Sequence, residues 1–170
     1  MDFLELVKAR YSCKKFSEAP VEREKLEKVL EAGRLAPTAK NSQPQHIYVL
    51  ESKESLALAD KITPCRYGAP VVLAVAHDTE NVFEYPGGAH NSGAEDAAIV
   101  ATHFVLEAKA LGLDTCWLNY FDPDKAKELL GLPKNEVLTI LIDVGYADPS
   151  AKPLPNHDSR KPLSETVTYR

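Results

Sequence analysis

Glycine is scarce in this chain, with eight glycines among 170 residues, and no predicted strand is followed by a GxGxxG motif. A GxxxxGK(S/T) motif is also missing. Both motifs bind phosphate through a glycine-rich turn, so neither a dinucleotide-binding βαβ unit nor a P-loop is indicated. Any phosphate group that this chain binds would therefore be held by side chains.

Cysteine is sparse as well. Cys13, Cys65 and Cys116 stand far apart, and none belongs to a CxxC pair. An odd number of widely spaced cysteines does not indicate a disulfide framework. The five histidines show neither an HExxH motif nor the Cys/His spacing of zinc sites, so no metal site is expected.

Long apolar runs are missing too: no stretch approaches the twenty residues of a transmembrane helix, and residues 1–5 lack the basic start of a signal peptide. The formal net charge of -5 does not favour a general nucleic-acid binder. We therefore expect a cytoplasmic protein that binds neither membranes nor nucleic acids. Its length suits one domain with a normal core, which we assign to residues 1–170.

What the chain does contain is a series of segments with helical apolar spacing, separated by continuous apolar runs typical of buried strands. Helices are expected at residues 2–10, 20–35, 52–62, 92–111 and 122–131, and strands at 47–50, 70–76, 113–118 and 137–144.

The longest predicted helix begins with a capping-box pattern, Ser92 followed by Glu95, and ends before Gly112. It is apolar on most of its sides, which predicts burial against the sheet and against another subunit. His103 and Glu107 are spaced to form a pair on its polar edge.

The basic segment of residues 8–16 follows the first helix. Arg10 continues the helical spacing of Phe3 and Val7, which places it on or next to the buried face of that helix. An arginine in such a place suits a phosphate ligand. Taken alone, the segment is more typical of a solvated basic turn.

Residues 37–44 form a polar loop bounded by prolines. The side-chain amides of Asn41 and Gln43 either satisfy backbone groups of the loop or bond a ring that presents carbonyl and N–H groups. Residues 77–91 predict an irregular loop, either a plain surface loop or a short cover over a site. Residues 146–170 are rich in proline and poor in apolar residues, so this arm is expected to lie across another surface.

In their order and spacing, residues 8–16, 37–44, 114–119 and 160–163 resemble the nitroreductase family of flavoproteins, and the resemblance covers nearly the whole chain. It implies an α+β fold with a central mixed, mainly antiparallel sheet flanked by helices. It also implies a homodimer with FMN at the interface and a C-terminal arm that crosses to the partner subunit. The residues implied to bind FMN are Arg10, Tyr11, Ser12, Lys14, Pro37, Thr38, Ala39, Asn41, Gln43, Trp117, Leu118, Asn119, Arg160 and Lys161.

Within that set, the resemblance gives Arg10, Ser12 and Lys14 to the phosphate, joined by the basic residues of the arm, and places the backbone near Asn119 beside flavin N5. Many short members have glycine where Asn119 stands, and asparagine tolerates left-handed backbone angles better than most residues. Trp117 suits either packing or stacking on a flavin.

The activity implied by the resemblance is ping-pong oxidoreduction. NADH or NADPH reduces FMN, and a small aromatic acceptor such as a nitroaromatic or quinone then takes the electrons. Two alternatives stay open: a flavin-binding storage or sensor protein without turnover, and an enzyme of the same fold that dehalogenates an aromatic or degrades flavin.

Overall fold

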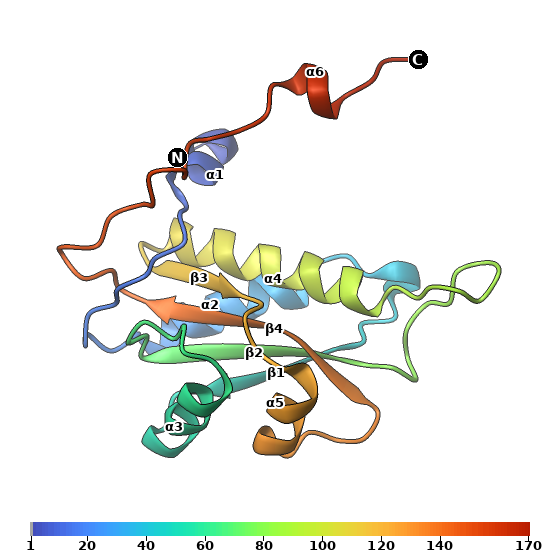
Figure 1. Cartoon of the computed structure of the whole chain (residues 1–170), viewed down its shortest axis with the longest axis horizontal. Helices are drawn as coiled ribbons and strands as arrows, with labels where there is room; N and C mark the ends of the chain where they lie inside the picture. Colours follow the sequence, from blue (N-terminus) through green and yellow to red (C-terminus); the bar gives the residue numbers. More distant parts are fainter. Residues whose placement is uncertain (1) are drawn as a thin grey trace.

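Residues 2–170 of the chain are described by a computed structural model, which is built around a four-stranded antiparallel sheet (Figure 1). The strands, in spatial order, are β1 (Gln45–Leu50), β2 (Val71–Asp78), β4 (Glu136–Gly145) and β3 (Asp114–Leu118). The helices are α1 (Phe3–Ala9), α2 (Arg23–Arg34), α3 (Lys53–Ile62), α4 (Gly93–Ala110), α5 (Pro123–Leu130) and α6 (Leu163–Thr166), with a short 3-10 turn, η1, at Ala39–Asn41. The predicted α+β fold is confirmed. Within the described residues, parallel pairing is confined to an isolated bridge between Ser12 and Thr115.

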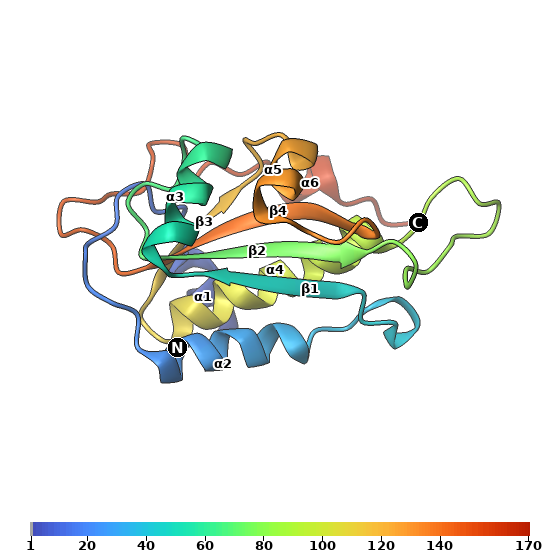
Figure 2. The same ribbon diagram turned by 90° about the horizontal axis from the view of Figure 1, so that it is seen from below.

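The sheet separates two helical layers, as Figure 2 shows from below. Val71, Leu73 and Val75 of β2 belong to the core shared with α2 and α4, whereas Val72 and Ala74 belong to the core shared with α3 and α5. Successive side chains of a strand point to opposite faces. β2 is apolar on both faces because helices cover both of them, which explains its continuous apolar run.

Helix α4 crosses the middle of one face and is held close to α2. A Cβ atom built on Gly33 of α2 would lie 2.0 Å from the ring of Phe104 of α4. Only glycine leaves room for that ring at this contact. This close contact between α2 and α4 fixes the position of α4. Helix α4 in turn positions the functional residues near its two ends.

Most helix ends agree with the sequence. Asp2 and Glu5 form the expected capping box of α1, Asp122 caps α5, and Gly131 ends α5 with a left-handed φ of 66°. The capping box expected at Ser92 is wrong: the Ser92 side chain makes no capping bond.

The pair expected between His103 and Glu107 is also wrong. The ring of His103 instead contacts the backbone carbonyl of Ile99 at 2.8 Å. A carbonyl one turn back is the nearest acceptor for a half-buried imidazole on a helix.

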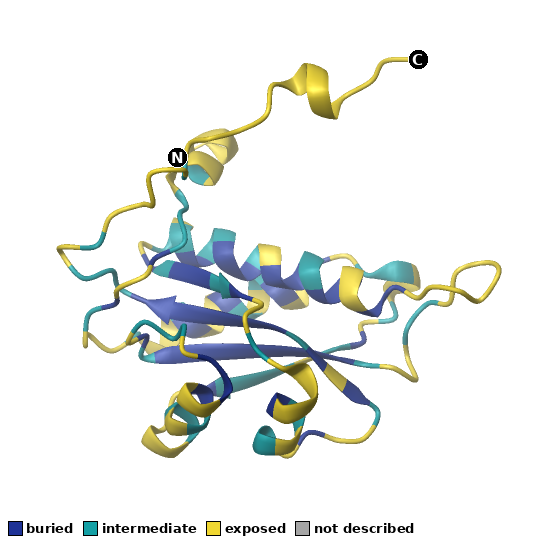
Figure 3. Cartoon of the chain, in the orientation of Figure 1, coloured by how far each residue is buried: buried dark blue, intermediate teal, exposed yellow. Residues whose placement is uncertain are grey.

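The buried face expected for α1 is not present within this chain. Phe3 and Leu4 are each 66% exposed and Val7 is 39% exposed, although α1 lies beside α4. The C-terminal arm is exposed as well from residue 158 onward, and Figure 3 shows its path away from the sheet. Both segments thus present apolar side chains to the outside, a point that matters for assembly.

None of the helices in residues 2–170 has the length and the apolar character that crossing a membrane would require.

Candidate functional site

Backbone hydrogen bonds attach the basic segment to the edge strand β3. The amide of Cys13 donates to the carbonyl of Thr115 at 2.9 Å. Cys13 is fully buried. Because side chains alternate along an extended chain, its neighbours Ser12 and Lys14 face away from the core.

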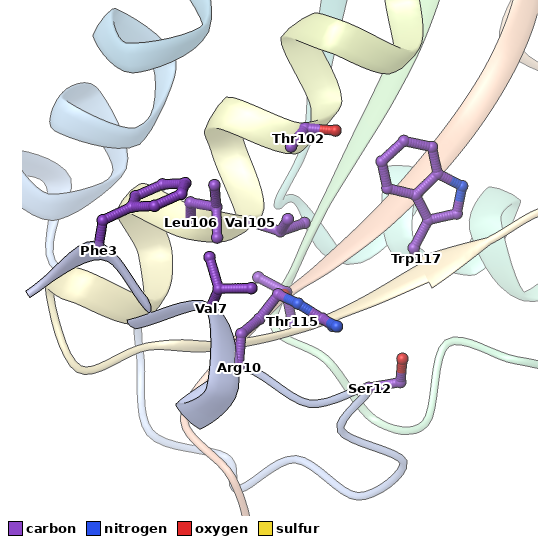
Figure 4. A pocket seen from close by; sticks show the side chains of 9 residues that line it. All are labelled: Phe3, Val7, Arg10, Ser12, Thr102, Val105, Leu106, Thr115 and Trp117. Atoms are coloured by element: carbon purple, nitrogen blue, oxygen red, sulfur yellow. The ribbon is translucent and has the colours of Figure 1, made fainter. Parts of the chain in front are cut away.

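A first cleft, called here the apolar cleft, lies between α1, α4 and β3 and has a volume of about 540 Å³. Figure 4 shows the side chains that line it, which are Phe3, Val7, Arg10, Ser12, Thr102, Val105, Leu106, Thr115 and Trp117. The guanidinium group of Arg10 points from the end of α1 toward the space between Ser12 and Trp117. The apolar cleft is therefore lined mostly by apolar side chains, with one cation facing into it.

A second cleft, the polar cleft, has a volume of about 510 Å³ and shares Ser12 and Trp117 with the first. It is lined by Ser12, Lys14, Cys65, Tyr67, Cys116, Trp117, Leu118, Asn119, Tyr120, Leu154 and Asn156. Both volumes fall in the range of roughly 300–1,000 Å³ that is usual for small-molecule sites. Five of the predicted site residues of the basic segment and β3 thus meet here.

The cations beside these clefts are not neutralised. Within residues 2–170, the ion pairs include neither Arg10 nor Lys14. The ammonium of Lys14 instead lies 3.4 Å from the hydroxyl of Tyr67 and 5.3 Å from the centre of its ring. A charge held by a neutral partner stays available to an anionic ligand.

At the end of β3, the indole nitrogen of Trp117 donates to Oδ1 of Asn119 at 2.6 Å. The amide nitrogen of Asn119 lies 3.4 Å from the carbonyl of Thr139 on β4. The left-handed backbone considered for Asn119 is not found, since the non-glycine residues with positive φ in the described chain are Lys40, Asn41, Gln43 and Tyr67. The asparagine side chain thus ties the tryptophan to the neighbouring strand.

Among the residues that line the polar cleft is the buried thiol of Cys116, whose cross-strand neighbour on β4 is a buried acid. Burial raises the pKa of the Cys116 thiol to about 12, so this cysteine is a neutral, unreactive group. Asp143, its partner across the β3–β4 ladder, is fully buried, and neither carboxyl oxygen has a hydrogen-bond partner in the described chain. Burial raises the pKa of Asp143 to about 9, so its carboxyl is protonated at neutral pH.

The loop of residues 37–43 lies at the other end of α4. The backbone amide of Ala39 donates to Oδ1 of Asp96, in the first turn of that helix, whereas Leu106 lines the apolar cleft. The residues of α4 that line the apolar cleft, from Thr102 to Leu106, lie six to ten positions after Asp96, about 9–15 Å along a helix, and none of residues 37–43 lines either cleft. A single chain therefore does not bring this loop to the basic segment.

Gln43 lines a third cleft, of about 420 Å³, together with Ser42, Pro44, Gln45, His46, Asp78, Asn81 and Glu136. The side-chain amide of Gln43 also serves the backbone of the loop, since its Nε2 donates to the carbonyl of Asn41 at 3.1 Å.

A model of the nitroreductase family matches residues 7–66 and 62–146, which is most of the chain. The chain belongs to the nitroreductase family. Three relatives give the scale of the similarity. A nitroreductase family protein from Clostridium difficile 630 is 38% identical, with a TM-score of 0.93 over 99% of this chain and 98% of that chain.

An FMN-dependent nitroreductase from Clostridium difficile R20291 is 26% identical, with a TM-score of 0.77 over 98% of each chain. An NADH dehydrogenase from Thermus thermophilus is 28% identical in an alignment that covers 95% of this chain and 92% of that protein.

Besides those of the loop of residues 37–43, three residues that the nitroreductase resemblance assigns to the cofactor lie outside the two clefts of this chain. Tyr11 is half-buried between Lys109 of α4 and His157 of the arm, and burial raises its pKa. Arg160 donates to carbonyls of its own arm, His157 and Ser159, and Lys161 is exposed. Their role toward a cofactor stays a prediction.

Tyr67 is the cleft residue that sequence reasoning missed most clearly. It has a left-handed φ of 53° and carries Lys14 over its ring. A hydrogen bond with the Cys65 thiol, together with burial, raises its pKa. No local pattern marks a tyrosine in a connector as a partner for a lysine far away in the sequence.

Arg66, next to Tyr67, is not a free cation of the site. It forms two bonds with Asp60, of 2.6 and 2.8 Å, and a third with the carbonyl of Ala69. Within residues 2–170, no group of three or more His, Cys, Asp or Glu side chains is placed to hold a metal ion.

Proposed function

We propose that this member of the nitroreductase family is an FMN-dependent NAD(P)H oxidoreductase that works as a homodimer. The observation behind the proposal is the position of Arg10, Ser12 and Lys14. These three donors, which have no carboxylate partner in the described chain, line two joined clefts of ligand size.

The residues around these clefts fit FMN group by group. A phosphate dianion matches the guanidinium of Arg10, the hydroxyl of Ser12 and the ammonium of Lys14, and each charge-assisted bond is worth about 1.5–3 kcal/mol. A flat aromatic ring matches the wall formed by Trp117 and Leu118. No glycine cradle is required, in keeping with the few glycines of the chain.

The homodimer completes what one chain leaves apart. A two-fold axis places a surface of one subunit against the same surface of the other. It therefore lets the loop of residues 37–43 of one copy reach the basic segment of the second copy, although the two lie at opposite ends of α4. The exposed apolar side chains of Phe3, Leu4 and Leu163 would be buried in such an assembly.

When bound, FMN supplies the redox chemistry, accepting a hydride from NADH or NADPH and passing electrons to a second substrate in a ping-pong sequence. The chain supplies binding and position. Arg10 and Lys14 would hold the phosphate end, and Trp117 and Asn119 would form the wall beside the ring. The loop predicted at residues 77–91, whose first two residues belong to β2 in the structure, is short, which favours an open site and flat acceptors such as nitroaromatics or quinones.

An absorbance spectrum of the purified protein, followed anaerobically while NADH and then NADPH is added, tests this proposal. Flavin bands that bleach with either nucleotide are the expected result, and they identify the donor. A quinone or a nitroaromatic should then reoxidise the reduced flavin and restore its absorbance bands.

Bound flavin that neither nucleotide reduces would indicate a storage or sensor protein. Reoxidation by a halogenated aromatic alone would indicate a dehalogenase, and consumption of the flavin itself a flavin-degrading enzyme. A protein that contains no flavin and binds no added FMN would overturn the proposal.

A further inference from the structure

The carboxylate of Asp96 lies at the junction of α4 and the loop of residues 37–43. Its side chain is buried, with the residue 1% exposed. Oδ1 accepts a hydrogen bond of 2.8 Å from the backbone amide of Ala39, and Oδ2 accepts one of 2.6 Å from the hydroxyl of Ser92. Both oxygens are therefore engaged, one of them by the loop.

The loop has an unusual backbone. Lys40, Asn41 and Gln43 have φ angles of 52°, 55° and 50°, in the left-handed region that residues with a Cβ seldom occupy. Such a conformation persists only where surrounding groups fix it.

Few groups outside the loop do so. Of the hydrogen bonds made by residues 37–43 within the described chain, those of Asn41 and Gln43 stay inside the loop. The bond from Ala39 to Asp96 is the one that reaches the rest of the fold. A contact of the Lys40 ammonium with the ring of Phe83, at 4.7 Å, adds a weaker tie.

The position of Asp96 is itself rigid. A Cβ atom on Gly93 would lie 2.4 Å from the ring of His77, so the start of α4 is packed against β2 without space for a larger residue. A carboxylate in the first turn of a helix is also stabilised by the positive end of the helix dipole. Asp96 is thus a fixed acceptor to which the loop is attached.

We propose that Asp96 is a positioning residue, which holds the loop of residues 37–43 in its left-handed form so that the loop meets the flavin bound by a second copy of the chain. The proposal rests on the proposed FMN-dependent function of the dimer. Asp96 touches neither cleft lined by the basic segment, and it acts through the backbone amide of Ala39.

The test compares Asp96→Ala, Asp96→Asn and the control Glu95→Ala. Glu95 is a carboxylate in the same turn of α4, but it accepts from the hydroxyl of Tyr85 and not from the loop. Asp96→Asn keeps a side-chain oxygen that can accept from Ala39, so it should largely restore the behaviour that Asp96→Ala loses.

The first measurement uses the protein without FMN. Trypsin cleavage after Lys40, followed by mass spectrometry, reports the order of the loop, and cleavage after Lys109 in α4 reports global unfolding. We expect Asp96→Ala to raise the rate at Lys40 at least tenfold without raising the rate at Lys109, and Glu95→Ala to change neither. An unchanged rate at Lys40 would overturn the proposal.

The second measurement is a titration with FMN that follows its absorbance spectrum. We expect Asp96→Ala to weaken binding about tenfold and to shift the visible bands of bound FMN, and Asp96→Asn to do so much less. A loosened loop with unchanged FMN affinity and unchanged absorbance bands would overturn the flavin-positioning part of the proposal.

If the unsubstituted protein binds no FMN, the proposed function fails, and the trypsin result still decides whether Asp96 orders the loop. If Asp96→Ala does not fold, deuterium exchange at the amide of Ala39 in the unsubstituted protein decides: strong protection of this amide supports the bond to Asp96, and exchange as fast as that of an exposed loop amide would overturn the proposal.

Discussion

The indole nitrogen of Trp117 donates a hydrogen bond of 2.6 Å to Oδ1 of Asn119, where the apolar cleft and the polar cleft meet. Trp117 lines both clefts and is the single tryptophan of the chain. Its fluorescence is therefore a direct report on the site.

Asn119→Ala should shift the emission of Trp117 and lower the free energy of unfolding by about 1 kcal/mol, the net value of one hydrogen bond. Fluorescence spectra and urea unfolding measure the two effects. Asn156→Ala, which changes another asparagine of the polar cleft, is the control and should leave the emission in place. Equal spectra for the two variants would contradict the role given to the Trp117–Asn119 bond.

Arg10→Ala should weaken FMN binding about 10- to 100-fold, because it removes one charge-assisted bond to the phosphate. Arg10→Lys should fall between, since lysine keeps the charge but not the planar fork. Quenching of Trp117 fluorescence by FMN measures the affinity.

Riboflavin, which lacks the phosphate, supplies the control for this prediction. Its affinity should be nearly the same for the unsubstituted protein and for Arg10→Ala. A variant that loses riboflavin and FMN in equal proportion would show that Arg10 acts on the fold and not on the phosphate. Arg34→Ala, which changes an exposed arginine paired with Glu31, should affect neither ligand.

Leu163→Glu should weaken the proposed dimer. Leu163 is 74% exposed on the arm, and in the described chain it belongs to neither core. Burial of its side chain against a second copy would stabilise the dimer, and a charged side chain at this position would oppose that burial. Sedimentation over a range of protein concentrations measures the change, and far-UV circular dichroism checks the fold. Ser164→Glu, which adds the same charge one residue later, should disturb assembly less. A dimer that tolerates both substitutions equally would argue against an arm that docks through Leu163.

The sequence predicts what local chemistry determines. Asp122 followed by Pro123 begins a helix and Gly131 ends one, because capping and left-handed geometry depend on a few adjacent residues. The apolar run through β2 likewise predicts a strand covered on both faces. The wrong prediction at Ser92 also concerns residues close in the sequence: the Ser92 hydroxyl bonds the carboxylate of Asp96 and not the backbone of the helix.

The arrangement of the site depends on contacts between distant parts of the chain. Ala39 and Asp96 are 57 positions apart, and Lys14 and Tyr67 are 53 apart. No spacing rule connects such residues, because the packing of α4 and of the connector before β2 decides which side chains meet. The family resemblance names Arg10, Ser12 and Lys14, but it does not point to Tyr67 or to Asp96.

Asp143 gives a prediction about pH. Its folded pKa of about 9 lies far above the value of about 3.9 for an exposed aspartate. Between these values the folded protein binds a proton that the unfolded chain releases. The contribution of Asp143 to stability is therefore complete below about pH 4 and is lost as the pH rises toward 9.

Asp143→Asn removes this dependence, because an amide does not ionise. Whatever the amide itself costs in the core is the same at every pH. Relative to the unsubstituted protein, the variant should therefore gain roughly 2–4 kcal/mol in the free energy of unfolding between pH 5 and pH 8. Urea unfolding of both proteins at the two pH values measures the difference. Asp158→Asn, which changes a fully exposed carboxylate, should show no such gain. If Asp143→Asn and the unsubstituted protein keep the same difference at pH 5 and pH 8, Asp143 is ionised in the folded protein over this range and its buried carboxyl is not held in the neutral form.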